Sequence, residues 1–233
     1  MYKQYRILGI IPARGTNDEV EHLNIKQLGG RPMLVYSVER ALKTSFLDTV
    51  IVSTEDEKTA KIAEATGALV PFLRPPELSS PKATLANVVI HALNNLEEDY
   101  HVVVMLLPNS PFRRRDDIDQ AIALLGDGDY DSVISVVEER DFFWYIHNDS
   151  FKPLTHEGAS GRRECKPIYR MAGGIEVCWT KNYETPQYLG QNIGFYMMRK
   201  HNALTIYNIY DLLVAERLVK LPESLIYELI QSE

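Results

Sequence analysis

The stretch RILGIIPARG, residues 6–15, indicates the fold class of this chain. Its first six residues are nearly all apolar, which is typical of a strand buried in a parallel sheet. The turn that follows places Arg14 beside Gly15, where backbone amides and a guanidinium group can bind a phosphate together. Arg-Gly pairs also occur in ordinary turns, so the stretch alone leaves a phosphate site and a plain turn open.

Strand-like and helix-like segments alternate after this stretch. Strand-like runs occupy residues 49–53, 69–72, 101–107 and 131–137. Segments with helical spacing lie between them, at residues 32–42, 55–67, 84–98 and 116–126. This alternation predicts a three-layer α/β fold, in which helices cover both faces of a mostly parallel, Rossmann-like sheet.

The pattern changes after Val137. Residues 138–170 are aromatic, polar and turn-rich, which indicates an excursion from the sheet. Such an excursion can line a substrate pocket, make a dimer contact or be a plain surface insertion. Two further strands at residues 173–180 and 193–199 and a helix at 210–220 then complete a single domain over residues 1–233.

Composition limits the possible functions. The chain has 233 residues, 45% of them apolar, which is enough for one substantial core. Its net charge of -7 argues against a general nucleic-acid binder. Cys165 and Cys178 lack metal-ligand spacing, and no apolar run approaches the roughly 20 residues that cross a bilayer. We therefore expect a cytoplasmic protein without a membrane partner.

Ligands of an open α/β sheet bind beyond the carboxyl ends of the strands, so we expect any site to lie in the loops that follow the strands. Four of them carry polar or basic groups: PARGT (12–16), STE (53–55), LRPPELSS (73–80) and LPNSPFRRR (107–115). Each also has a structural interpretation, because Ser53 and Thr54 suit a helix cap and the arginines after Phe112 suit a solvated helix entry.

Taken in order, these loops resemble the acylneuraminate cytidylyltransferases, also called CMP-sialic acid synthetases. The matching segments are IIPARGTNDEVEHLNIK (10–26), VSTE (52–55), VPFLRPPELSSPKAT (70–84), LLPNSPFR (106–113), RMAGGIEV (170–177) and TIYNIYDL (205–212). The resemblance spans about residues 6–218, and several motifs in one order are more specific than any single motif.

The resemblance implies transfer of CMP from CTP to an acidic 2-keto sugar such as a sialic acid, with Mg²⁺ as cofactor. It also implies a homodimer, which can pair further into a tetramer, with residues 138–170 as the dimerisation segment. The implied nucleotide-binding residues are Ala13, Arg14, Gly15, Asn24, Arg74, Asn109 and Ser110. On the sugar side it implies Arg170 and Gly173, and Arg163 belongs to a basic pair that can recognise a sugar carboxylate.

The chain departs from the family pattern where charge matters. Asn17, Asp18 and Glu19 replace the Ser-Lys-Gly of the family, so a carboxylate stands where an ammonium group would face the triphosphate. A carboxylate and a phosphate about 4 Å apart repel each other by about 4 kcal/mol at an effective dielectric constant of about 20. Thr205 and Tyr207 replace the two metal-binding aspartates. Only Asp211 remains nearby, and we expect it to cap a helix.

The other departures remove polar groups from the pattern. Leu107 replaces a glutamine that helps to read the nucleotide, and Ala172 replaces an asparagine.

Three hypotheses remain open. The chain is an active transferase that recruits magnesium through Asp18, Glu19 or Glu55; or it is a catalytically silent nucleotide- or sugar-binding homologue that serves as a subunit or scaffold; or it uses a different substrate.

Overall fold

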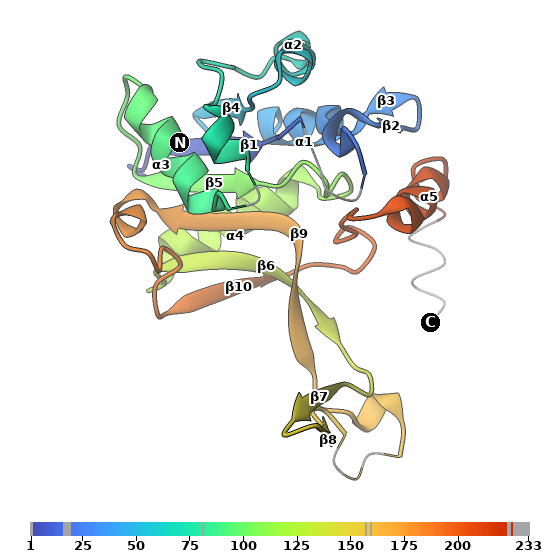
Figure 1. The fold of residues 1–233 in the computed structure, drawn as a ribbon. Helices are drawn as coiled ribbons and strands as arrows, with labels where there is room; N and C mark the ends of the chain where they lie inside the picture. Colours follow the sequence, from blue (N-terminus) through green and yellow to red (C-terminus); the bar gives the residue numbers. More distant parts are fainter. Residues whose placement is uncertain are drawn as a thin grey trace.

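The middle layer of the molecule is a six-stranded sheet with strand order β10-β6-β9-β5-β1-β4 (Figure 1). The computed structural model describes residues 2–15, 20–80, 82–156, 158, 160–222 and 225. The strands of the sheet are β1 (Ile7–Pro12), β4 (Thr49–Ser53), β5 (Val102–Leu106), β6 (Ser132–Glu139), β9 (Ile168–Trp179) and β10 (Ile193–Met197). Only β9 runs antiparallel to its neighbours within this sheet, which confirms the mostly parallel, Rossmann-like architecture.

Helices form the two outer layers. The helices are α1 (Met33–Leu42), α2 (Glu57–Thr66), α3 (Leu85–Asn95), α4 (Arg115–Asp127) and α5 (Ile209–Leu218). Residues of α1, α2 and α4 share one apolar cluster with the sheet, whereas α3 packs on the opposite face through Val89 and Ala92. Helix α5 belongs to a third cluster with Leu28 of the small β2 (Gln27–Leu28) and β3 (Arg31–Pro32) ribbon.

The coverage of the sheet is less complete than we expected. Three alternate residues of β10 are partly exposed: Ile193 by 39%, Phe195 by 58% and Met197 by 42%. Tyr169 of β9 stacks on Phe195 with 5.9 Å between ring centroids. Because α3 packs over β1, β4 and β5, an apolar strip on β9 and β10 faces outward.

Local signals place the helix ends. Asp56 caps α2 by accepting a hydrogen bond of 2.8 Å from the Thr59 amide, and Gly67 ends the helix with φ of 102°. The cap is therefore Asp56 and neither Ser53 nor Thr54. The described part of the chain also contains short 3-10 helices: η1 (Leu23–Ile25), η2 (Pro76–Ser79), η3 (Arg162–Glu164) and η4 (Thr180–Glu184).

Residues 69–72 do not form the strand that their composition predicts. Leu69 and Leu73 make only isolated parallel bridges, to Ile51 and Thr54. Pro71 lies between them and has no amide hydrogen for a ladder, so the segment runs beside β4 without joining the sheet.

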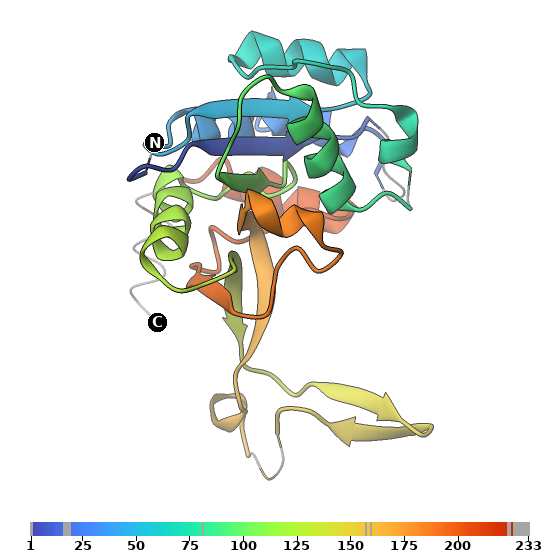
Figure 2. The ribbon, with the colours of Figure 1, turned by 90° about the vertical axis from the view of Figure 1, so that its left-hand side faces the viewer.

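The excursion predicted after Val137 is an arm that projects from the body (Figure 2). Strands β6 and β9 continue past the sheet as a two-stranded stem and lead to a hairpin of β7 (Trp144–His147) and β8 (Ser150–Pro153). Asn148 and Asp149 both have positive φ, 48° and 56°, as a two-residue type I′ hairpin turn requires. Trp144, Ile146 and Phe151 are exposed on this hairpin.

No helix in the described part of the chain is long and apolar enough to span a membrane.

Candidate functional site

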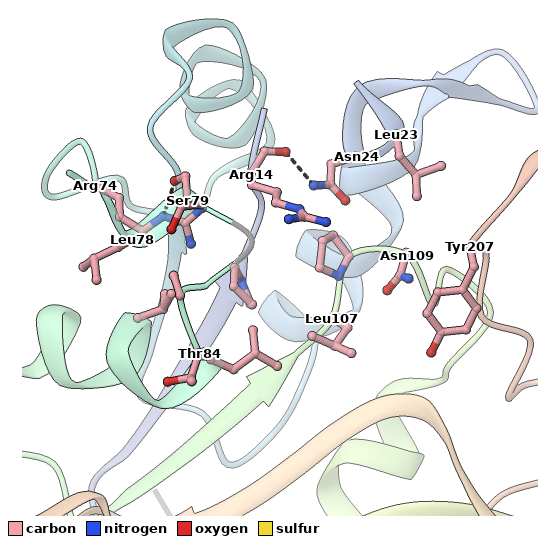
Figure 3. Close-up of a pocket in the computed structure, with 16 residues that line it drawn as sticks. Arg14, Leu23, Asn24, Arg74, Leu78, Ser79, Thr84, Leu107, Asn109 and Tyr207 are labelled. Carbon is pink, nitrogen blue, oxygen red and sulfur yellow. Dashed lines mark hydrogen bonds between the residues drawn. The ribbon is translucent and has the colours of Figure 1, made fainter. Parts of the chain in front are cut away.

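A cavity of about 370 Å³ lies at the carboxyl ends of β1 and β5, where ligands of open α/β sheets bind. Figure 3 shows its sixteen lining residues. They are Pro12, Arg14, Leu23, Asn24, Arg74, Leu78, Ser79, Ser80, Ala83, Thr84, Leu85, Val88, Leu107, Pro108, Asn109 and Tyr207. The cavity thus combines an apolar surface from α3 and its entry with two arginines.

Arg14 reaches the middle of this cavity from the loop after β1 (Figure 3). Its carbonyl oxygen accepts a hydrogen bond of 2.8 Å from the side-chain amide of Asn24, which is itself 7% exposed. Asn24 lies in η1, so its hydrogen bond joins η1 to the loop after β1. The conformation of residues 16–19 lies outside the described residues.

Arg74 lies in the opposite wall of the cavity, and Glu55 holds it from behind that wall. The Arg74 Nη2 donates to Glu55 Oε2 at 2.9 Å, and Arg74 Nε donates to Ser79 Oγ at 3.1 Å. Ser79 Oγ donates in turn to Glu55 Oε2 at 2.6 Å. The second oxygen of Glu55 accepts the Gly15 amide at 2.8 Å. One carboxylate therefore joins the loop after β1, the loop after β4 and the segment around η2.

These contacts shift the pKa values of Glu55 and Arg74. Burial alone would raise the pKa of Glu55, but hydrogen bonds from Ser79, from the Gly15 amide and from Arg74 lower it below its usual value. Burial lowers the pKa of Arg74, Glu55 counteracts that effect, and the positive charge of Arg14 lowers it further. The Glu55 carboxylate is therefore charged at neutral pH, with both oxygens already occupied.

The wall near Tyr207 is held by neutral hydrogen bonds. Asn109 and Ile206 bond twice, because the Asn109 Nδ2 donates to the Ile206 carbonyl at 3.0 Å and the Ile206 amide donates to the Asn109 carbonyl at 2.8 Å. The hydroxyl groups of Ser110 and Thr205 lie 3.0 Å apart and are both buried. These contacts fix Tyr207 at the rim of the cavity.

A fully buried arginine lies behind this wall. Arg113 Nη1 donates to the carbonyls of Gly173 and Gly174 at 2.9 and 3.0 Å. Its Nη2 donates to Ser37 Oγ at 2.7 Å and to the Leu107 carbonyl at 2.8 Å. Burial lowers the pKa of Arg113 to about 9. Arg113 therefore connects three segments, which are α1, strand β9 and the loop after β5. It does not line the cavity.

The structure separates the predicted nucleotide residues into two groups. Arg14, Asn24, Arg74 and Asn109 line the cavity. The other three are Ala13, Gly15 and Ser110, which lie behind the lining. Ala13 and Ser110 are fully buried, the Gly15 amide is occupied by Glu55, and a Cβ at Gly15 would come within 2.7 Å of Asp56 Cβ.

The predicted sugar-side residues lie elsewhere. Arg163 belongs to η3 in the arm and lines a separate cavity of about 480 Å³ with Arg140 and Lys200. Arg170 lies in the stem and pairs with Glu139 at 3.3 Å. Gly173 has φ of 73° and its carbonyl accepts from Arg113. None of the three is among the described lining residues of the first cavity.

The described lining of the cavity offers no carboxylate to a magnesium ion. The described residues contain no cluster of three or more His, Cys, Asp or Glu side chains that could hold a metal ion. Asp211 Oδ2 accepts the amides of Tyr207 at 2.9 Å and Asn208 at 3.2 Å, which confirms the predicted helix cap. Asp18 and Glu19, the other acids considered for a metal, lie outside the described residues.

Sequence reasoning missed two features of the site. It considered Glu55 as a helix-cap neighbour or a metal ligand, whereas Glu55 clamps the cavity wall. It also assigned no role to the entry of α3, where Thr84, Leu85 and Val88 line the cavity. The Thr84 cap, which accepts from the Asn87 amide at 3.2 Å, is the sequence signal that could have located this wall.

The sequence of this chain also matches known proteins. A family model described as cytidylyltransferase matches residues 8–230. An N-acylneuraminate cytidylyltransferase of Escherichia coli is 31% identical over 86% of this chain and 49% of its own length. A CMP-N,N'-diacetyllegionaminic acid synthase of Legionella pneumophila is 31% identical, over 51% of this chain and 53% of that protein. A pseudaminic acid cytidylyltransferase of Campylobacter jejuni is 35% identical, over 49% of this chain and 50% of that protein. The matches thus span about half the length of these curated relatives.

Two solved structures share the fold at low sequence identity. A CMP:2-keto-3-deoxy-manno-octonic acid synthetase complexed with CTP has a TM-score of 0.70 and 14% identity, over 92% of this chain and 98% of that chain. A 4-diphosphocytidyl-2C-methyl-D-erythritol synthase from Anaerococcus prevotii has the same TM-score of 0.70 and 14% identity, over 93% and 97%. At this identity the likeness establishes the fold alone.

Proposed function

This chain belongs to the cytidylyltransferase family, and from that membership we propose that it transfers CMP from CTP to an acidic 2-keto sugar of the nonulosonate class, with release of pyrophosphate. The names of the relatives that act on sialic, legionaminic and pseudaminic acids support this substrate class. The two buried cysteines are free, which suits the reducing cytoplasm that we propose as its location.

One observation carries the proposal: the cavity at the carboxyl edge of the sheet contains Arg14 and Arg74 next to an apolar surface. A planar pyrimidine base suits the apolar part formed by Leu85, Val88 and Leu107. The phosphates suit the arginine part, because guanidinium groups form strong charge-assisted hydrogen bonds with phosphate oxygens.

In the proposed reaction, the anomeric hydroxyl of the sugar attacks the α-phosphorus of CTP. The new bond joins the sugar oxygen to phosphorus, the bond from the α-phosphorus to the bridging oxygen breaks, and pyrophosphate leaves with that electron pair. The proton of the hydroxyl is released to solvent or to a base. Arg14 and Arg74 neutralise the phosphate charge and hold the nucleotide in place, which are the main contributions of a protein to phosphoryl transfer.

We also propose that the chain acts as a homodimer, which can pair further into a tetramer. The apolar strip on β9 and β10 and the exposed aromatic hairpin of the arm are features of a surface that a second copy covers. If Arg163 binds the sugar carboxylate, it must do so in the cavity of a second subunit, because in its own subunit it lines another cavity.

A second candidate is a catalytically silent homologue that binds a nucleotide or sugar and serves as a subunit or scaffold. The observation that favours it is the pair Thr205 and Tyr207, which present hydroxyl groups at the positions that align with the family aspartates. Leu107 supports the same interpretation, since it adds an apolar side chain where a polar one would contact the base.

Calorimetric titration with CTP, followed by a pyrophosphate-release assay with a panel of nonulosonic acids, separates the candidates. Binding of CTP with pyrophosphate release that depends on one sugar supports the transferase. Binding without release from any sugar favours the silent homologue. Absence of CTP binding under all conditions contradicts the nucleotide site itself.

A further inference from the structure

We propose that this pocket binds nucleotide phosphates without a magnesium ion held by the protein, with guanidinium groups and neutral hydrogen bonds in place of the cation. The inference rests on the proposed nucleotide site. It concerns how that site compensates phosphate charge, and therefore which form of the nucleotide it takes.

The charge of the cavity lining is the first argument. Arg14 and Arg74 are the charged members of the described lining, which contains no aspartate or glutamate. Magnesium is bound in proteins through oxygen ligands, usually one or two carboxylates together with phosphate oxygens and water. Arg74 is paired with Glu55, which stands behind the lining, so the charged groups that face the cavity itself are guanidinium groups, which bind phosphate rather than a cation.

The second argument comes from Thr205 and Tyr207. The Thr205 side chain is 7% exposed, and its hydroxyl lies 3.0 Å from Ser110 Oγ, within a wall of neutral groups. Tyr207 is 56% exposed and presents its ring to the cavity (Figure 3). Neither side chain carries a negative charge at neutral pH, so neither is a good ligand for a hard cation.

Among the described acids, Glu55 and Asp56 lie next to the loops that form the cavity, and both already accept hydrogen bonds. Both oxygens of Glu55 accept hydrogen bonds, from Gly15 on one side and from Arg74 and Ser79 on the other. Asp56 Oδ2 accepts from the Thr59 amide and hydroxyl at 2.8 and 2.6 Å. A metal on Glu55 Oε2 or Asp56 Oδ2 would compete with the hydrogen bonds that shape the loop after β4.

The same network prepares Arg74 for a phosphate. Arg74 is 4% exposed, and Glu55 and Ser79 fix its guanidinium plane before any ligand arrives. A fixed donor loses little conformational entropy when it binds, so its bonds to phosphate are more favourable. The charge of Arg14 lowers the pKa of Arg74, and an anion that binds both arginines relieves this repulsion.

The test is calorimetric titration of the full chain with CTP, once with excess EDTA and once with excess MgCl₂. We expect CTP to bind no more than about threefold tighter with MgCl₂ than with EDTA, and weaker binding in MgCl₂ also agrees with the inference, because the excess cation occupies the phosphate oxygens that the arginines would bind. Binding that requires magnesium, or is at least about tenfold tighter with it, would overturn the inference and leave the proposed nucleotide site intact. No binding under either condition would overturn both.

A pair of variants gives a second readout. Tyr207→Asp adds a carboxylate at the exposed rim, and Tyr207→Asn is the neutral control of nearly the same shape. We expect CTP affinity to become magnesium-dependent by about tenfold in Tyr207→Asp and to stay independent in Tyr207→Asn. If the wild type already depends on magnesium and Asp18→Ala with Glu19→Ala removes this dependence, the metal belongs to those acids and the inference is wrong.

Discussion

The Glu55 carboxylate contacts Arg74 at 2.9 Å and the Gly15 amide at 2.8 Å, so a single side chain connects the two loops that carry the arginines of the site. Arg74 is nearly inaccessible to solvent, and its charge would be unfavourable there without a partner. The geometry of the cavity therefore depends on a residue that is not among the lining residues.

Glu55→Gln should weaken nucleotide binding. The glutamine side chain has nearly the same shape as glutamate but no charge. It also places an NH₂ donor among the three groups that donate to Glu55, which are the Gly15 amide, Arg74 and Ser79. We expect a loss of about 1–3 kcal/mol in the free energy of unfolding and about tenfold in CTP affinity. Chemical denaturation and calorimetry measure the two quantities. Glu57→Gln, at an exposed site two residues away, is the matched control; equal effects of both changes would contradict the clamp.

The same pair predicts a pH dependence of stability. The folded state lowers the pKa of Glu55, so its ionised form stabilises the fold above the pKa of the unfolded chain, about 4.3. That contribution is lost as the pH falls through the lower folded-state value. The difference in unfolding free energy between wild type and Glu55→Gln should therefore be constant near neutral pH and shrink below about pH 4. A difference that grows toward acid pH would contradict this assignment.

Arg113→Met should destabilise the fold strongly. Methionine fills much of the same volume but removes the guanidinium donor from the Gly173 carbonyl and from Ser37 Oγ, and it removes one of two donors from the carbonyls of Leu107 and Gly174. We expect a loss of about 3 kcal/mol or more in the free energy of unfolding. Arg115→Met, whose side chain is 57% exposed, should change it by less than about 0.5 kcal/mol. Denaturant unfolding of the two variants would reveal whether the buried guanidinium is a structural requirement.

Gly173→Ala tests the backbone bend in β9. Gly173 has φ of 73°, and a Cβ there would collide with Met198 Sδ, so alanine meets both a strained backbone and a collision. We expect a loss of about 1–3 kcal/mol and a lower Tm. Gly161→Ala is the control, because no atom lies within 4 Å of the corresponding Cβ. A Tm unchanged in Gly173→Ala would show that the bend relaxes freely.

Phe195→Arg tests the proposed homodimer. Phe195 lies in the exposed apolar strip, where a charge would have to be buried on association. We expect the variant to sediment as a monomer at concentrations where the wild type is a dimer. Leu69→Arg, at a residue 57% exposed beside the opposite edge strand, should leave the mass unchanged. A monomeric wild type would contradict the dimer directly.

Much of the fold was accessible from local sequence patterns. Apolar runs located each strand of the main sheet, and Gly67 located the end of α2 as predicted. The wrong assignment was residues 69–72, where apolar composition suggested a strand although Pro71 lacks the amide that a ladder needs. The cap of α2 was misplaced by two residues, because Ser53, Thr54 and Asp56 all have capping chemistry.

The site was only partly accessible. The arginines and Asn24 could be selected because they lie in loops that follow predicted strands, where side chains of one sheet edge converge. The partners of these residues could not be selected. Ser110 meets Thr205 across 95 positions of sequence, and Arg113 meets Gly173 across 60, and no local pattern encodes such pairs.

By itself, the sequence determined the fold class, the succession of strands and helices, the family and the loops at which to search, because periodicity and turn chemistry are local properties. The tertiary structure alone decided that Glu55 is a clamp, that Ser110 lies behind the lining and that Arg163 points to another cavity. It did so because burial and hydrogen-bond partners depend on strand order, which brings residues together from distant parts of the chain.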